Sequence, residues 1–206
     1  MKVIRRYSDG ERMTHWVVAI TFVLAGLSGL AFFHPSMFFF SYLFGGGPWT
    51  KILHPFIGLV MFFAFILMAV HHWRDNLMQP GDAEWRAKAR DLLMGKHPQM
   101  PEAGKFNAGQ KMLFWVLVIC MAVLLATGVL LWRPWIAPFV PIVLLRVAVL
   151  LHAVAAVLLI VSVIGHIYMA IWTKGSIRAM TRGTVPEGWA KMHHPAWYRQ
   201  MTQGKS

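Results

Sequence analysis

Four long apolar stretches constrain this chain more than any other feature of its sequence. They cover residues 14–33, 52–72, 111–132 and 147–173. A helix needs about 20 mostly apolar residues to cross a bilayer, and each stretch reaches that length. Hydrophobic residues make up 57% of the 206 residues and charged residues only 14%, which is not the composition of an ordinary soluble domain. The sequence therefore predicts an all-α integral membrane protein, in which residues 1–206 form one domain with a bundle of four transmembrane helices.

The basic residues fall almost entirely on one side of this predicted domain. Of the 20 Lys and Arg residues, 17 precede residue 14, lie between residues 73 and 111, or follow residue 173. All 8 acidic residues lie on that same side. Because cytoplasmic loops carry an excess of Lys and Arg, we expect both termini, the loop 73–110 and the tail 174–206 to be cytoplasmic. The net charge of +12 is then explained by basic residues on the cytoplasmic side of the membrane, and no nucleic-acid partner is expected.

The cytoplasmic loop contains one further predicted helix. The segment DAEWRAKARDLLMG, residues 82–95, has the amphipathic spacing of a short helix that lies on the membrane surface. We expect Trp85, Leu92 and Leu93 to meet the bilayer while the basic residues between them meet lipid headgroups. The segment is therefore interpreted as having a structural role and not as part of a catalytic or cofactor-binding site.

The single cysteine, Cys120, limits the cofactor chemistry. One cysteine excludes an intrachain disulfide, a haem attached through a CxxCH motif, and a cluster held by several cysteines of this chain. Cys120 falls in the middle of the third span and is expected to be a small buried apolar residue. The chemistry of the chain is therefore sought in its histidines.

Two histidines share one face of the fourth span. His152 and His166 are fourteen residues apart, which at 3.6 residues per turn returns to within about 40° of the starting direction and rises about 21 Å. Both imidazoles thus face the same side, one near each leaflet, with His152 on the outer side. A polar side chain within the hydrocarbon region normally faces the bundle interior and has a partner or a function.

Two further histidines occur at matching depths on other spans. His15 lies at the cytoplasmic start of the first span, and His54 lies at the outward start of the second. The topology pairs His54 with His152 on the outer side and His15 with His166 on the inner side. Two opposed imidazoles at one depth are typical of a b-type haem with both axial positions filled, which transfers electrons without binding oxygen. Gly29, Gly58, Gly128 and Gly165 are candidates for the residues that leave room for the flat porphyrins.

Alternative interpretations of these histidines remain open at this point. Each could form an interhelical hydrogen bond, in a haem-free membrane anchor. His72 shares a face with His54 and competes with His15 for the inner position. A metal transporter could also use intramembrane histidines, although it would favour carboxylates or thiolates beside them, and the spans hold no acid. The histidines outside the spans are expected at the surface; they are His34, His97, His193 and His194.

Several motifs resemble those of one known family. They are ERMTHW, ILHPFIGLVMF, GKFNAGQKMLFW, TGVLLWRP, LLHAVAAVLLIV, HIYMAIWTKGSIRAM and WAKMHHPAWYR. Together, from about Arg6 to Arg199, they resemble the cytochrome b556 (gamma) subunits of respiratory membrane-bound formate dehydrogenases. The first and fourth spans alone are equally similar to cytochrome b subunits of nickel–iron hydrogenases and thiosulfate reductases. GKFNAGQK and HHPAWYR favour the formate dehydrogenase branch, although Ala196 stands where that family usually has a basic residue.

This resemblance implies a four-helix cytochrome in the bacterial inner membrane that holds two b haems. The axial ligands fall on His15, His54, His152 and His166, which favours His15 over His72. The implied partners are an iron–sulfur beta subunit and a molybdenum- or tungsten-containing alpha subunit on the periplasmic side, assembled as a trimer of heterotrimers. Electrons from formate would pass to the outer haem, then the inner haem, then a quinone. The chain itself would contain no formate-oxidising site.

The resemblance also places the quinone, menaquinone or ubiquinone, on the cytoplasmic side near His166. The implied residues are Asn107, Gly109 and Gln110. Amide side chains and the free backbone N–H groups at a helix start can donate hydrogen bonds to quinone carbonyls. An alternative interpretation is that Asn107 only caps the third helix while Lys105 and Lys111 meet lipid phosphates.

Overall fold

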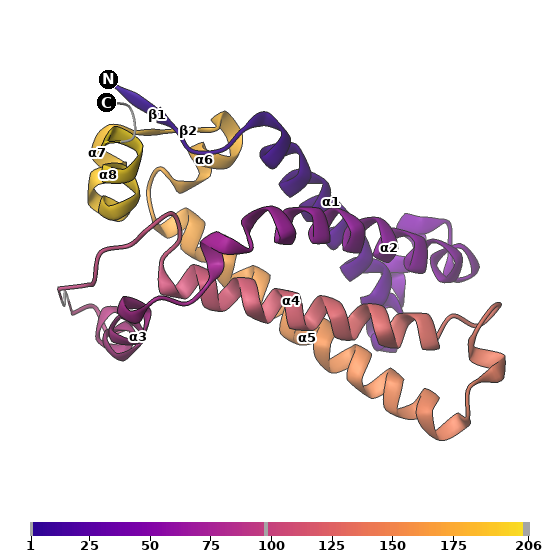
Figure 1. Cartoon of the computed structure of the whole chain (residues 1–206). Helices are drawn as coiled ribbons and strands as arrows, with labels where there is room; N and C mark the ends of the chain where they lie inside the picture. The colour runs from indigo at the N-terminus through magenta and orange to yellow at the C-terminus, as the bar shows by residue number, and fades with distance from the viewer. Residues whose placement is uncertain (1, 97–98, 204–206) are drawn as a thin grey trace. The chain divides into compact units, whose positions relative to one another are not determined.

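The four apolar stretches form the four longest helices of the chain (Figure 1). The computed structural model describes residues 2–96 and 99–203. The long helices are α1 (Asp9–Phe33), α2 (Gly47–His72), α4 (Ala108–Leu130) and α5 (Ile142–Trp172). Each is long and apolar enough to cross a membrane, with mean hydropathy between 2.2 and 2.9. The prediction of an all-α protein with four membrane helices is confirmed.

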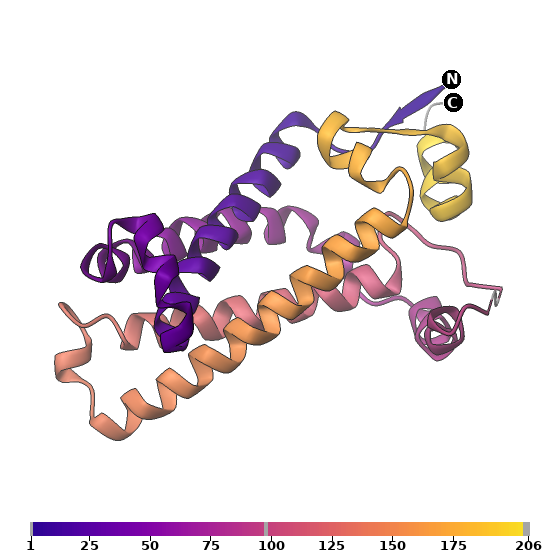
Figure 2. The ribbon, with the colours of Figure 1, turned by 180° about the vertical axis from the view of Figure 1, so that it is seen from behind.

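The helices extend beyond the apolar stretches that predicted them. The first begins at Asp9 and the fourth at Ile142, each five residues before the predicted span. Figure 2 shows α5 from behind as one uninterrupted helix. Helices continue past the hydrocarbon region because hydrogen bonding within the backbone does not depend on the polarity of the side chains. Hydropathy therefore identifies the apolar part of each helix but not the residue at which the helix begins.

Short elements connect the long helices. The loop after α2 contains η2 (Arg74–Asn76) and α3 (Pro80–Leu93), which confirms the helix predicted there. The side chains of Leu92 and Leu93, and the whole of His97, lie outside the described part of the chain. The connection after α1 contains the 3-10 helix η1 (Pro35–Phe44), and the connection after α4 contains the 3-10 helix η3 (Ala137–Phe139).

The tail after α5 is folded, and sequence patterns did not predict its structure. It comprises α6 (Ser176–Arg182), β2 (Thr184–Pro186), α7 (Glu187–His193) and α8 (Pro195–Gln203). Strand β2 pairs antiparallel with β1 (Val3–Arg5), with Ile4 opposite Val185, so that a segment near the start of the chain lies beside the tail (Figure 1). Three-residue strands carry too little periodicity to be recognised in a sequence.

The chain divides into two compact units. One unit comprises Met13–Met68 and Val116–His166 and contains most of the four long helices. Most of its buried side chains are small, with Met61, Phe65, Met121 and Leu159 as the large exceptions, whereas many of its large apolar ones, such as Leu67 and Leu158, are exposed. Small residues let membrane helices approach one another closely, and large ones are solvated by lipid tails. The pattern of burial is therefore that of a bundle built for a membrane.

The other unit comprises Met1–Arg12, Ala69–Trp115 and Ile167–Ser206. Its small core contains Tyr7, Ala179, Val185, Ala190 and Trp197. It gathers the two chain ends, the long loop and the tail into one packed body. This explains why the tail is ordered although no long apolar stretch occurs in it.

The expectation that His194 lies at the surface is wrong. His194 is only 3% exposed, and its Nδ1 atom lies 2.7 Å from the Gly104 carbonyl oxygen. The Arg6 guanidinium lies 3.3 Å from its Nε2 atom. Because a guanidinium can only donate and a carbonyl can only accept, His194 carries its proton on Nδ1 and is neutral. Burial, and then the charge of Arg6, lower the pKa of His194 to about 3.

Candidate haem-binding site

The four histidines singled out in the spans lie in two pairs. The ring centroids of His54 and His152 are 6.3 Å apart, and those of His15 and His166 are 6.4 Å apart. All four residues belong to the unit that contains the long helices. His15 comes from α1 and His54 from α2, while α5 supplies one member of each pair. Three helices thus contribute imidazoles at two levels of one bundle.

Ser28 determines the protonation of His54. Its Oγ atom lies 2.8 Å from His54 Nδ1 and 2.8 Å from the Leu24 carbonyl oxygen. The hydroxyl has one proton, which it donates to a carbonyl of its own helix, so it accepts the hydrogen bond from His54 Nδ1–H. The lone pair of His54 Nε2 is then free to bind a metal.

Thr127 has the same relationship to His152. Its Oγ1 atom lies 2.8 Å from His152 Nδ1 and donates to the Val123 carbonyl oxygen at 2.6 Å. His152 therefore also carries its proton on Nδ1 and leaves Nε2 free. Thr127 belongs to α4, which supplies no histidine, so each of the four long helices contributes to the two pairs.

In the inner pair, no hydroxyl group among the described residues accepts a hydrogen bond from His15. The Nδ1 atom of His15 is buried and has no hydrogen-bond partner among the described residues. Its ring packs edge-on against Trp16, with centroids 5.6 Å apart. The two pairs therefore have similar ring spacing but different hydrogen bonding.

Two glycines lie directly against the outer pair. A Cβ atom at Gly29 would lie 3.4 Å from Cε1 of His54, and one at Gly128 would lie 3.4 Å from Cε1 of His152. A Cβ atom at Gly58 or Gly165 would have no atom within 4 Å. Each of the two close glycines directly follows the hydroxyl residue that holds the imidazole. The Ser-Gly and Thr-Gly pairs thus combine a hydrogen-bond acceptor with space for the ring.

The ring spacing fits one metal ion between two imidazoles. A metal–imidazole bond is about 2.0–2.1 Å long for zinc, so two such bonds in line, with half a ring at each end, give a centroid separation close to the observed 6.3 and 6.4 Å. A free Nε2 lone pair on His54 and His152 meets the chemical requirement for a ligand. The spacing of both pairs, and the free nitrogens of the outer pair, therefore fit a metal ion held by two histidines.

The sequence matches the prokaryotic cytochrome b561 family over residues 6–183. The chain belongs to this family.

This cytochrome is 43% identical over 198 residues to the cytochrome b556(fdo) subunit of formate dehydrogenase from Escherichia coli K12, covering 96% of this chain and 93% of that protein. It is 40% identical over 205 residues to the cytochrome b556 subunit of the nitrate-inducible formate dehydrogenase of the same strain, covering 100% and 94%. It is also 40% identical over 202 residues to the formate dehydrogenase cytochrome b556 subunit of Haemophilus influenzae, covering 98% and 85%. The resemblance to these subunits is confirmed, and a cytochrome b family implies haem b.

His72 occupies a different environment in this cytochrome from the four paired histidines. It belongs to the unit that gathers the chain ends, where its ring packs edge-on against Phe106 with centroids 5.6 Å apart. Its Nε2 atom lies 3.5 Å from Glu11 Oε1. The residue that lies beside His166 is His15.

The Asn107–Gln110 segment forms a reciprocal cap at the start of α4. The Gln110 N–H donates to Asn107 Oδ1 at 2.9 Å, and the Asn107 N–H donates to Gln110 Oε1 at 3.0 Å. Both side-chain oxygens are therefore used in starting the helix. Gly109 lies beneath Trp85, because a Cβ atom there would be 2.9 Å from Trp85 Cη2. Trp85, predicted to meet the bilayer, packs against this segment and is partly exposed.

A small cavity borders this segment. Its volume is about 30 Å³, and its lining includes Gln79, Trp85 and Asn107. This is room for about two water molecules. The two lysines nearby do not point to lipid phosphates, contrary to the alternative interpretation: Lys111 Nζ lies 2.8 Å from Asp82 Oδ2, and Lys105 Nζ lies 3.0 Å from Asp75 Oδ2.

Sequence reasoning missed Ser28 and Thr127. Hydroxyl residues within membrane helices commonly bond to their own helix backbone, so neither residue stood out. The signal was the repeated pair of a hydroxyl residue followed by glycine, Ser28-Gly29 and Thr127-Gly128. Only the packing of helices shows that each pair faces an imidazole.

Proposed function

We propose that this chain is the membrane cytochrome b subunit of a formate dehydrogenase, in which it anchors the complex and carries electrons to a quinone. The names and the 40–43% identity of its relatives support this function. The observation that carries it is the presence of two imidazole pairs with ring spacing near 6.3 Å within a bundle of four apolar helices.

His54 and His152 are proposed to hold one haem b, and His15 and His166 a second. A haem held by two of these histidines would supply one-electron transfer without oxygen binding. Ser28 and Thr127 keep the outer imidazoles in the tautomer that exposes Nε2, through the hydrogen bonds of 2.8 Å.

The two levels are proposed to conduct electrons across the membrane. His152 and His166 are about 21 Å apart along α5, since each residue of a helix rises about 1.5 Å. The distribution of basic residues supports cytoplasmic termini and, with them, a position of His152 on the periplasmic side. Electrons then enter from the iron–sulfur beta subunit, which receives them from a molybdenum- or tungsten-containing alpha subunit. The complex is proposed to be a trimer of heterotrimers in the bacterial inner membrane.

Asn107, Gly109 and Gln110 are proposed to bind the quinone, menaquinone or ubiquinone, on the cytoplasmic side. The cap uses the side-chain oxygens of Asn107 and Gln110, which leaves their NH₂ groups as donors to quinone carbonyls. A cavity of about 30 Å³ does not hold a quinone ring, so binding requires neighbouring side chains such as Trp85 to move.

Haem content tests the proposed function directly. We expect the purified complex to contain two b haems per copy of this chain, and His54→Ala or His152→Ala to retain one. His34→Asn is a matched control, because asparagine keeps the cap that His34 provides at the start of η1. Two haems in either outer-pair variant would contradict the assignment. A haem-free anchor or transporter would show no b-type absorption, and a hydrogenase or thiosulfate reductase cytochrome would co-purify with other subunits.

A further inference from the structure

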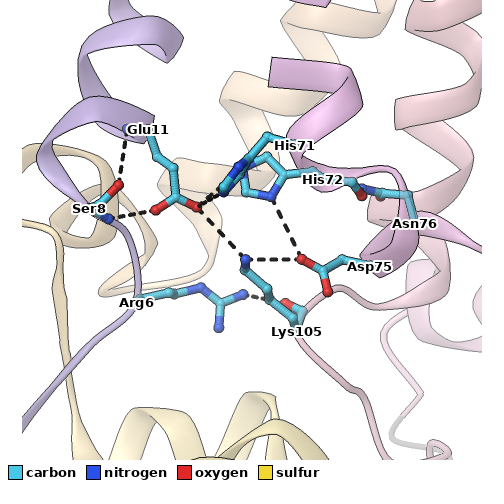
Figure 3. A network of polar contacts seen from close by, with 8 residues as sticks. All are labelled: Arg6, Ser8, Glu11, His71, His72, Asp75, Asn76 and Lys105. Carbon is cyan, nitrogen blue, oxygen red and sulfur yellow. Dashed lines mark hydrogen bonds and ion pairs between the residues drawn. The ribbon is translucent and has the colours of Figure 1, made fainter. Parts of the chain in front are cut away.

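We propose that Glu11, His71 and His72 form a binding site for a divalent transition-metal ion, with zinc as the representative ion (Figure 3). The three side chains meet where α1 begins and α2 ends, within the unit that gathers the chain ends. One nitrogen of each histidine and a carboxylate oxygen of Glu11 lie within 4.8 Å of one another. None of the three is among the four histidines proposed to hold haem.

The spacing of the ligand atoms suits a tetrahedral ion. His71 Nε2 lies 3.1 Å from Glu11 Oε1, and His72 Nε2 lies 3.5 Å from the same oxygen. Zinc bonds of about 2.0–2.2 Å in a tetrahedral arrangement place neighbouring ligand atoms roughly 3.3–3.5 Å apart. Two imidazoles and one carboxylate, with the fourth position open to water, are also a ligand set that zinc uses in proteins.

The carboxylate of Glu11 is held in place before any ion binds. The Ser8 N–H donates to Glu11 Oε2 at 2.7 Å, and the Glu11 N–H donates to Ser8 Oγ at 3.2 Å. This reciprocal pair is a capping box at the start of α1. It fixes one carboxylate oxygen on the helix and presents the other, Oε1, to both imidazoles (Figure 3).

A second carboxylate lies near His72. The Nδ1 atom of His72 is buried and has no hydrogen-bond partner among the described residues, and Asp75 Oδ2 lies 3.7 Å from it. Metal-binding imidazoles commonly donate their other N–H to a carboxylate, which fixes the ring and strengthens the metal bond. A small closure of this gap would complete that arrangement.

The nearby lysine does not prevent binding. Lys105 Nζ lies 3.8 Å from Glu11 Oε1 but only 3.0 Å from Asp75 Oδ2. An ion at Oε1 therefore competes with the weaker contact and leaves the closer ion pair intact. The His71 side chain is 60% exposed, so an ion can enter from solvent.

Zinc binding to the purified complex tests this site. The complex is treated with a chelator, titrated with Zn²⁺ against a competing chelator, and compared with the Glu11→Gln and His71→Ala variants. Glutamine keeps the capping box, and His71 is exposed, so both variants should fold. We expect the wild-type complex to bind one more zinc equivalent per chain than either variant, or to bind it at least tenfold more tightly. His34→Asn should bind like the wild type.

X-ray absorption at the zinc edge identifies the ligands. We expect a first shell of nitrogen and oxygen, with two imidazoles, that is lost in both variants while the haem spectrum stays unchanged. Equal zinc binding by the wild type and both variants would overturn the proposal, as would a shell containing sulfur. The zinc site uses none of the proposed haem ligands. A result that contradicts the haem ligands and a result that contradicts the zinc site can therefore be told apart.

Discussion

The Oγ atom of Ser28 lies 2.8 Å from Nδ1 of His54, and its own proton is donated to the carbonyl of Leu24. A serine on one membrane helix thus fixes which nitrogen of a histidine on the next helix carries the proton. Thr127 does the same for His152 from a third helix. These contacts leave each of the two imidazoles with Nε2 as its free nitrogen.

Removing the hydroxyl of Thr127 should change the potential of the outer haem. A ligand imidazole that donates a hydrogen bond is more basic and favours oxidised iron. We expect Thr127→Val to raise the midpoint potential by a few tens of mV, since a tenfold change in a one-electron equilibrium is about 59 mV. An optical redox titration measures this.

Two variants serve as controls for the Thr127 experiment. Thr127→Ser keeps the hydroxyl and should restore the wild-type potential. Thr21→Val removes a hydroxyl whose hydrogen bonds, among the described residues, are to its own helix, at 2.6 Å from the Val17 and 3.2 Å from the Val18 carbonyl oxygen, and should leave both potentials unchanged. Equal potentials in Thr127→Val and the wild type would show that the contact has no influence on the haem.

Substituting His15 and His72 separately should give different haem contents. His15 lies beside His166, with ring centroids 6.4 Å apart, whereas His72 lies beside Glu11. We expect His15→Ala to retain one b haem per chain and His72→Ala to retain two. The pyridine haemochrome assay on the purified complex counts them. One haem in His72→Ala together with two in His15→Ala would reverse the assignment of the inner ligand.

Breaking the ion pair between Lys111 and Asp82 should destabilise the loop at the start of α4. Lys111 is 3% exposed and its Nζ atom lies 2.8 Å from Asp82 Oδ2. Removing one partner of a buried pair costs about 3–5 kcal/mol because the other charge is left without compensation. We expect Lys111→Met to lower the thermal unfolding temperature of the complex. The double variant Lys111→Met/Asp82→Asn should recover part of the loss; no recovery would mean that the charge of Asp82 is not the cause.

The stability of the unit that gathers the chain ends should fall in mild acid because of His194. Its pKa is about 3 in the folded protein and about 6.5 in the unfolded chain. Between these values the unfolded chain binds more protons, so the free energy of unfolding decreases as pH falls from 6.5 toward 3 and gains nothing further above 6.5. We expect a shallower pH dependence of thermal unfolding in His194→Gln, measured from pH 7 to pH 4.5. An unchanged slope would contradict this role of His194.

Much of the fold followed from local properties of the sequence. The four long helices, the helix in the loop after α2, and the common face of His152 and His166 depend on runs of apolar residues and on the helical period, which neighbouring residues determine together. The starts of the helices did not follow, because backbone hydrogen bonding begins before the apolar residues that identify a span.

The remaining features depend on contacts between residues far apart in the sequence. Ser28 meets His54 across 26 positions, and Arg6 meets His194 across 188. The periodicity and composition of a sequence do not indicate which side chains meet when helices pack or when β1 pairs with β2. The sequence by itself determined a membrane bundle with histidines at two depths. Only the tertiary structure decided the protonation of these histidines, the burial of His194 and the contact of Glu11 with His71 and His72. Each of these features results from packing between segments that are distant in the sequence.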